Sequence, residues 1–332
     1  MVSKQMQERL KDLAPNLTVV NDMTESHKFK EYSRVLAKFI DEIIVFDDHV
    51  KWLNKEETLF KFPKTQSQLL EDMKSFVIPF ATLIKLCVKW FRFYDVWMDG
   101  CFEYLDPKFV ENTTEDFLKD FQKTQKFYRN KIKSDTDTSP ELIFKGQLED
   151  PDVEKLPAPL KICARMIQTI KDFRLGVHVV SIMCNPALRE RHWVEMSGIA
   201  ARDLQPDAGT TLRKIINYNL NCLDECEVIS IGACKELQLQ KNLASMQSEW
   251  DTVKFFFGEF KNTGITILSS VDEIQAMLDD HIVKTLSMRG SAFVKPSEAE
   301  VKAWYNKLIR VQSTIEVWGK VQSTWVRIFS IV

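Results

Sequence analysis

The chain has 332 residues, 45% of them hydrophobic, and its 45 Lys and Arg against 47 Asp and Glu give a formal net charge of -2. This length suits two or more packed units, and the near balance of charge excludes a general attraction to nucleic acid or to an anionic membrane surface. With 10 Gly and 11 Pro against 22 Phe and 8 Trp, the composition favours long helices over an all-β chain.

Three features indicate a chain that stays in a reducing compartment. Charged residues interrupt the N-terminal stretch, which lacks the apolar core of a signal peptide. Residues 76–93 are the most apolar run, but Lys85, Lys89 and Arg92 argue against a membrane span. The seven cysteines are spread singly, without a CxxC pair, which is typical of buried free thiols. We expect a cytoplasmic protein without disulfides.

The N-terminal part shows long apolar stripes after a polar start. Residues 1–28 have little periodicity, so we expect a poorly ordered lead-in. Apolar residues from Phe29 then recur every three or four positions and predict a helix to about Asn54. A second stripe predicts a helix from about Leu69, kinked or restarted at Pro79 and ended at Gly100.

A third helix and a loop complete the expected N-terminal bundle, residues 29–145. Thr113 or Thr114 is the predicted cap of that helix, because acidic residues follow in its first turn. Residues 135–140 are expected to form a loop. The polar, proline-bearing residues 146–159 are the predicted boundary to a second set of bundles, residues 160–325.

Shorter helices are predicted at the start of this second set. One covers residues 160–183 and is broken by the Asn185-Pro186 pair. A further break at residues 205–209 precedes helices over about residues 212–224 and 228–247.

A β-hairpin at about residues 250–270 is the expected exception to the helical pattern. Apolar residues alternate on both sides of the Asn262-Thr263-Gly264 turn, where Gly264 can adopt a positive φ. The expected inward side chains, packed on neighbouring helices, are Phe255, Phe257, Ile265 and Ile267.

The last predicted helix begins near Pro296 or Ser297, with Ser297 and Glu300 as a capping box. Its apolar stripe has the spacing of a heptad-like seam that docks on another helix, with Gln322 as the one polar break. The fold class is therefore mainly α, an elongated rod of stacked helical bundles with one small hairpin.

No motif for catalysis or cofactor binding stands out. The sequence contains no GxxxxGK[ST], GxGxxG, HExxH or GxSxG pattern, so we expect no P-loop ATP site, catalytic residue, metal ion or cofactor. The runs 47–49 and 279–281 each place two Asp beside a His, but neighbouring helical residues diverge by about 100°. Helix-end or salt-bridge roles are favoured over a metal site for both runs.

Three further kinds of site, a shared metal ion, a nucleophilic Cys and a base-stacking platform, stay open but are disfavoured. Cys222 and Cys226 are one helical turn apart and could share a metal ion, although core packing is favoured because no further ligand has standard spacing. A nucleophilic Cys with a distant His is conceivable, as is a base-stacking platform made of the Trp and Phe stripes. Helical spacing again favours a packed core.

A resemblance enters at residues 189–193. Their sequence, Arg-Glu-Arg-His-Trp, resembles the Arg-Asp-Arg-His-Trp signature of dynein heavy-chain linkers, with Glu190 as a conservative departure. The segments 250–264, 272–281, 288–291, 295–296 and 321–325 follow the family's order, and Trp97 to Gly100 resembles a weaker upstream element. The similarity spans about residues 65–325 and is closest to axonemal, inner-arm heavy chains. The motif residues, all in structural roles, are Trp97, Gly100, Arg189, Arg191, His192, Trp193, Trp250, Gly264, Asp279, Asp280, His281, Arg289, Gly290 and Trp325.

The resemblance implies a mechanical role. In this family the linker is a rod of helical bundles that couples the tail to the AAA+ ring of an ATP-driven, minus-end-directed microtubule motor, here for ciliary movement. Implied partners are the ring and dynein intermediate, light-intermediate or light chains, with no direct microtubule contact, nucleic acid or membrane. The implied location is the cytoskeleton, in the cilium axoneme. Residues 326–332 look divergent, and we expect a chain truncated before the ring.

Two other function classes remain. A helical adaptor or scaffold would bind partner helices through its apolar seams without any motor cycle. An enzyme would require a convergent pocket of titratable groups, for which the sequence offers no pattern.

Overall fold

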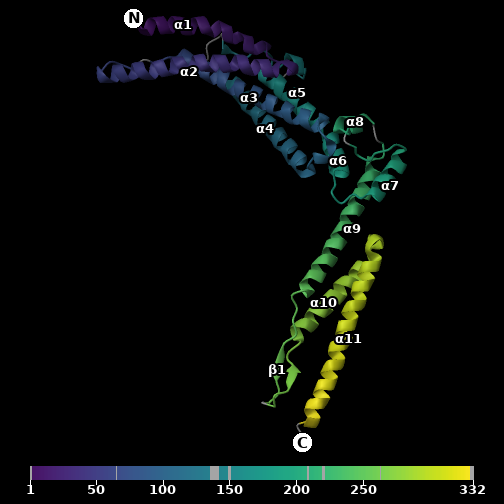
Figure 1. Cartoon of the computed structure of the whole chain (residues 1–332). Helices are drawn as coiled ribbons and strands as arrows, with labels where there is room; N and C mark the ends of the chain where they lie inside the picture. The colour runs from purple at the N-terminus through teal and green to yellow at the C-terminus, as the bar shows by residue number, and fades with distance from the viewer. Residues whose placement is uncertain are drawn as a thin grey trace. The chain divides into compact units, whose positions relative to one another are not determined.

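The computed structural model describes residues 2–64, 66–134, 142–148, 151–207, 209–218, 221–261 and 263–329. Over these residues the mainly α class with one antiparallel hairpin is confirmed (Figure 1). The predicted loop 135–140 and Asn262 of the predicted turn lie outside them. Among the described helices, none is both long and apolar enough to cross a membrane.

The chain divides into two compact units. The first comprises Met1–Cys184 and Pro206–Asn219, and the second comprises Asn185–Gln205 and Leu220–Val332. The first division point coincides with the Asn185-Pro186 break. Residues 146–159, which we expected to be the boundary, lie inside the first unit, where the amide of Gln147 donates to the carbonyl of Lys155 at 2.9 Å.

The first unit is built from three long helices, which follow one another along the chain, and from shorter helices before and after them. Its helices are α1 (Val2–Asn16), α2 (Phe29–Leu59), α3 (Gln68–Asp99), α4 (Pro107–Ser134), α5 (Ala158–Asp172), α6 (Arg174–Met183) and α8 (Leu212–Asn217). Contacts between α2 and α3 and between α4 and α5 hold it together. Its largest fully buried side chains are Trp90, Tyr128, Phe76, Phe80, Phe102 and Phe121.

Four sequence expectations in the first unit need correction. Residues 2–16 form a helix, and Leu10, Leu13 and Ala14 are buried, so the lead-in is packed. The missed signal is the spacing of these apolar residues on a short helix that has Pro15 next to its last residue.

The predicted cap of the third helix is also wrong. Helix α4 begins at Pro107, and the Asp106 carboxylate accepts from the amides of Lys108 and Phe109 at 2.9 and 3.3 Å. Thr114 instead lies buried inside the helix and donates to the Val110 carbonyl. Proline at the first helical position and Asp before it are the stronger start signal.

The stretch 160–183 is two helices, α5 and α6, and not one. They meet at Phe173, whose amide still donates to the Thr169 carbonyl at 3.1 Å. Helix α8 ends at Asn217, earlier than the predicted residue 224. The end of α3 is as predicted, because Gly100 is its C-cap and a Cβ there would clash with the Val96 carbonyl oxygen.

An aromatic cluster lies where α3 meets α4 and the α5–α6 junction. The Trp90 ring makes edge-to-face contacts with Trp97, Phe117 and Phe173, with centroids 6.0, 5.3 and 5.8 Å apart. The rings of Trp97 and Phe173 are stacked at 5.6 Å and 12°. Such geometry is the favoured packing of quadrupolar rings, so Phe173 ties the helix break to the core.

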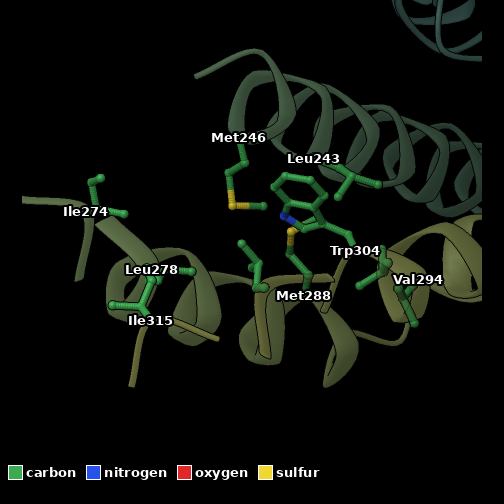
Figure 2. Packing of buried hydrophobic residues seen from close by; sticks show 10 residues of the cluster. Leu243, Met246, Ile274, Leu278, Met288, Val294, Trp304 and Ile315 are labelled. Carbon is green, nitrogen blue, oxygen red and sulfur yellow. The ribbon is translucent and has the colours of Figure 1, made fainter. Parts of the chain in front are cut away.

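The second unit contains α7 (Glu190–Ala200), α9 (Leu223–Trp250), β1 (Phe257–Glu259), β2 (Thr266–Leu268), α10 (Asp272–Arg289) and α11 (Glu298–Phe329). Helices α10 and α11 lie side by side (Figure 1). Trp304 of α11 sits among Leu243 and Met246 of α9 and Met288 of α10, with Leu278 and Ile315 farther along the same cluster (Figure 2). Three helices thus share one apolar core, as the stripe on the last helix predicts.

The hairpin exists, but of the four side chains expected to face inward only Ile267 is partly buried. In its register Phe257 lies opposite Leu268, Gly258 opposite Ile267 and Glu259 opposite Thr266. Phe255, Phe257 and Ile265 are 40, 53 and 37% exposed, whereas Phe260 and Leu268 are 8 and 7% exposed. With strands of three residues, alternation does not continue far enough to decide which face is covered.

Candidate functional site

The dynein-like signature lies at the start of α7. Arg189 is the residue before the helix, and its amide donates to Nδ1 of His192 at 3.0 Å. Nε2 of the same imidazole is 3.1 Å from Oε2 of Glu236 on α9, and Arg191 forms a salt bridge with that carboxylate. His192 is buried and Arg191 is half exposed. The signature therefore joins α7 to α9 through one glutamate.

The hydrogen bonds assign the tautomer of His192. Because an amide donates to Nδ1, that nitrogen must present its lone pair, and the proton of the neutral ring lies on Nε2. The Nε2–H can then donate to Glu236. Both ring nitrogens are engaged, so this imidazole has no lone pair left for proton abstraction or for a metal ion.

A second histidine repeats the arrangement between α9 and α10. His281 is 1% exposed, and its Nδ1 accepts from the indole Nε1–H of Trp250 at 3.0 Å. Its Nε2 is 3.2 Å from Oε2 of Glu249. The same argument places the proton on Nε2. His192 and His281 thus each connect one helix to α9 by a donor, an imidazole and a glutamate.

The acidic residues beside His281 point to different partners. Oδ1 of Asp279 accepts from Gln312 of α11 at 3.3 Å, and Asp280 pairs with Lys284 one turn away at 2.6 Å. In the other such run, Asp47 binds Lys51 at 2.7 Å and also Lys74, while His49 is exposed. Neither run converges on one point, in accord with the helix geometry.

The remaining motif residues end elements or fill the second unit. Gly290 is the C-cap of α10, and Gly264 has the positive φ, 69°, expected of the turn. The Arg289 guanidinium lies 5.0 Å from the centroid of the Tyr305 ring. Trp325 stacks on Phe329 at 5.1 Å.

Three motif residues have other surroundings. Trp193 lines a shallow cleft of about 400 Å³ on α7 and the loop after it. Trp97 and Gly100 belong to the first unit, at the end of α3.

Sequence reasoning missed or undervalued two residues that connect elements of the second unit. Gln322 binds both backbone groups of Leu268, accepting from its amide at 2.8 Å and donating to its carbonyl at 2.9 Å. Its signal was present as the polar break in the apolar stripe. Glu236 had no such signal, since its role depends on the packing of α7 on α9.

Three of the thiols are poor candidates for nucleophiles. Burial raises the pKa of Cys163 and of Cys184 to about 12. Burial, followed by the neighbouring Cys222, raises the pKa of Cys226 to about 12. A thiol with such a pKa is protonated at neutral pH and cannot attack as a thiolate.

Comparison with known proteins gives one consistent result. The family described as "Dynein heavy chain, N-terminal region 2" matches residues 70–332, a range that includes the tail 326–332. The chain is 38% identical over 305 residues to dynein axonemal heavy chain 12 of Homo sapiens, covering 92% of this chain and 9% of that protein. It is 31% identical over 274 residues to dynein axonemal heavy chain 3 of Mus musculus, covering 82% and 6%.

The chain therefore spans less than a tenth of the length of the curated relatives it matches. The matched range contains the His192 and His281 connections and the core of the second unit. By this match over most of its length, the chain belongs to the dynein heavy-chain family, in its N-terminal region 2.

Proposed function

We propose that the chain is a linker segment of an axonemal dynein heavy chain, a mechanical element that couples the tail to the AAA+ ring of an ATP-driven, minus-end-directed microtubule motor. The observation that carries this proposal is the family match over residues 70–332 together with relatives that are axonemal heavy chains. In this proposal the segment itself carries no ATPase chemistry and works in the cilium axoneme.

The connections within the second unit support a mechanical role. A segment that transmits force must keep its helices in register, because slack between them would absorb the displacement. His192 with Glu236, His281 with Glu249, and Gln322 with Leu268 fix α7, α10 and the hairpin to the long helices α9 and α11. Each uses directional hydrogen bonds in addition to apolar packing.

The proposed partners follow from the same family membership. They are the AAA+ ring and the intermediate, light-intermediate or light chains of a dynein, without direct contact to the microtubule. Binding to the ring is the most specific of these proposals. For strain to be transmitted, the affinity of the chain for the ring must change with the nucleotide state of the ring.

Binding to a dynein ring that lacks its own linker tests the proposal. The chain, labelled at its N-terminus with a fluorophore, is titrated with the ring by anisotropy under three conditions: without nucleotide, with ADP, and with ADP-vanadate. The proposal expects affinities that differ between these conditions by about fivefold or more, the usual range of coupling between sites.

Two controls make the outcome decisive. A ring whose Walker A lysines are replaced should remove the nucleotide dependence but not all binding. Equal affinity in all conditions would favour the helical adaptor instead, and the absence of binding would contradict the motor role. The chain alone should show no ATP hydrolysis above buffer.

A further inference from the structure

A groove of about 680 Å³ lies between α3 and α4 in the first unit. Its lining is apolar along the base, with Pro79, Leu83 and Leu86 from α3 and Tyr128 from α4. The side chains of Ile78 and Phe127, on opposite helices, are 44 and 48% exposed. Large apolar side chains that remain exposed along a groove are typical of interaction surfaces.

The spacing of the lining residues fits a helical occupant. On α3 the groove is lined from Ile78 to Lys89, and on α4 from Asp120 to Tyr128, in steps of three and four residues. Eleven steps along α3 correspond to about 16 Å, or three helical turns. The α4 side is shorter, with eight steps or about 12 Å. On both helices the lining residues recur at i, i+3, i+4 and i+7, a spacing that suits contact with an amphipathic helix.

The charge around the groove is one-sided. Lys85, Lys89 and Lys123 line it and are exposed, against one acidic lining residue, Asp120. In the part of the chain that the structure describes, none of these lysines makes a salt bridge, and Lys89 lies 5.5 Å from the centroid of the Phe117 ring. The ammonium groups are therefore available to an anionic partner.

We propose that this groove binds an acidic amphipathic helix of a partner protein, about three turns long. Its apolar anchors lie against Ile78, Leu86 and Phe127, and its flanking carboxylates face the lysines. The inference does not depend on the motor role, because an adaptor would use the same surface. It adds to the proposed function a site at which another chain attaches.

Other occupants predict different behaviour. A second copy of the chain would make the groove a dimer interface, with a mass that depends on concentration. A fatty acid or other anionic amphiphile would fill the apolar base without any preference for helical spacing. A second copy and an amphiphile can each be told from a partner helix by which molecules compete for the groove.

Selection from a library provides the test. Helical peptides of three turns, with random anchor and flank positions, are displayed and selected on the 332-residue chain. The proposal expects enrichment of leucine or isoleucine at i, i+3/i+4 and i+7 together with Glu or Asp on the flanks. An enriched peptide, synthesised and labelled, then gives a Kd by anisotropy.

A matched pair of variants assigns the site. Lys85→Glu with Lys123→Glu should weaken the peptide by about tenfold or more, because two attractive rim charges become repulsive. The control, Lys108→Glu with Lys126→Glu, makes the same change of net charge at exposed lysines of α4 that do not line the groove. It should leave the Kd within about twofold.

Several results would overturn the proposal. These are no enrichment, enriched peptides without acidic flanks, and equal effects of the two variant pairs. A Lys-flanked peptide that does not bind is the control. Displacement of the selected peptide by oleate micelles, at concentrations at which this control stays unbound, would indicate an amphiphile site. A concentration-dependent dimer in light scattering, abolished by the groove variant, would assign the surface to self-association.

Discussion

The carboxylate of Asp47 connects α2 to α3 through Lys74 and is also bound by Lys51 one turn along its own helix. Hydrogen bonds from Lys51 and then Lys74 lower the pKa of Asp47 below its usual value. A carboxyl group whose pKa is lower in the folded state stabilises the fold above its unfolded pKa, and this contribution is lost as the pH falls through the folded pKa.

Asp47→Asn should therefore cost about 0.5–1 kcal/mol at pH 7, the range for partly exposed ion pairs. The difference in the free energy of unfolding between the variant and the wild type should become smaller below about pH 4, where the carboxyl group in the unfolded chain begins to take up a proton. Urea denaturation at both pH values measures it. Asp48→Asn is the control, because Asp48 is more exposed and its contact with Lys51 is 3.4 Å. A difference in stability that does not depend on pH would contradict the stabilising role of the ionised Asp47 carboxylate.

Tyr128 carries a buried hydroxyl that has no hydrogen-bond partner among the described residues. Burial raises the pKa of this hydroxyl. Its ring packs edge-on against Phe144, with centroids 5.8 Å apart at 89°. An unpaired buried donor costs about 1–3 kcal/mol, whereas the ring packing stabilises the fold.

Tyr128→Phe should therefore raise the free energy of unfolding of the first unit by about 1 kcal/mol. Tyr128→Ala should lower it by about 3–5 kcal/mol, because the ring and its contacts are lost. Chemical denaturation followed in the near-ultraviolet measures both variants. A loss of stability in Tyr128→Phe would mean that the hydroxyl has a partner.

At the scale of elements, the hairpin is attached to α11 through Gln322. Its side-chain amide binds both the N–H and the C=O of Leu268, and Phe260 contacts the ring of Trp325 at 5.8 Å. An amide side chain that uses its donor and its acceptor on one residue acts like a neighbouring strand. A short hairpin gains from this attachment the support that it lacks alone.

Gln322→Ala should release the hairpin without unfolding α11. The loss of two hydrogen bonds predicts an increase of about tenfold in the exchange rate of the Leu268 amide, equivalent to about 1.4 kcal/mol. Hydrogen exchange resolved by residue measures it. The comparison variant is Gln312→Ala, which removes an exposed contact to Asp279 of 3.3 Å. It should leave the Leu268 amide unchanged.

The elements differ in how far the sequence could predict them. The long helices α2, α3 and α11 follow clear apolar stripes, and the hairpin follows alternation around Gly264. The start of α4 was missed because Thr113 and Thr114 resemble a cap, whereas Asp106 before a proline takes that role. The break at Phe173 has no local signal, since an aromatic residue at this position is ordinary in a helix.

The connections between helices were less predictable than the helices. The sequence singled out His192 and His281. Their partners Glu236 and Glu249 cannot be distinguished from the many other acidic residues until the packing of α9 is known. Contacts over 44 and 32 residues arise from tertiary structure and leave no trace in local spacing. The site motif was thus found through family resemblance, and its geometry through the structure.

At the scale of the whole molecule, each of the two units has a core of its own. Leu278 is fully buried in the cluster shared by α9, α10 and α11 (Figure 2). Mutations in separate cores act independently when they share no partner. Each unit can therefore be destabilised by itself.

Leu278→Ala should cost the second unit about 2–5 kcal/mol. Exchange of protected amides in α9, α10 and α11 should accelerate, while those of α3 and α4 keep their rates. Leu83→Ala in α3, where Leu83 is 1% exposed, should give the reverse pattern. Equal acceleration in both units for either variant would mean that the chain unfolds as one cooperative block.

The aromatic cluster around Trp90 gives the first unit an optical signature. Two indoles whose centroids are 6.0 Å apart at 80°, next to a phenyl ring stacked on one of them, form a fixed chiral array of chromophores. Fixed aromatic packing is what produces circular dichroism in the near-ultraviolet, and loose packing abolishes it. The chain thus carries a label-free spectroscopic reporter of order at the junction of α5 and α6.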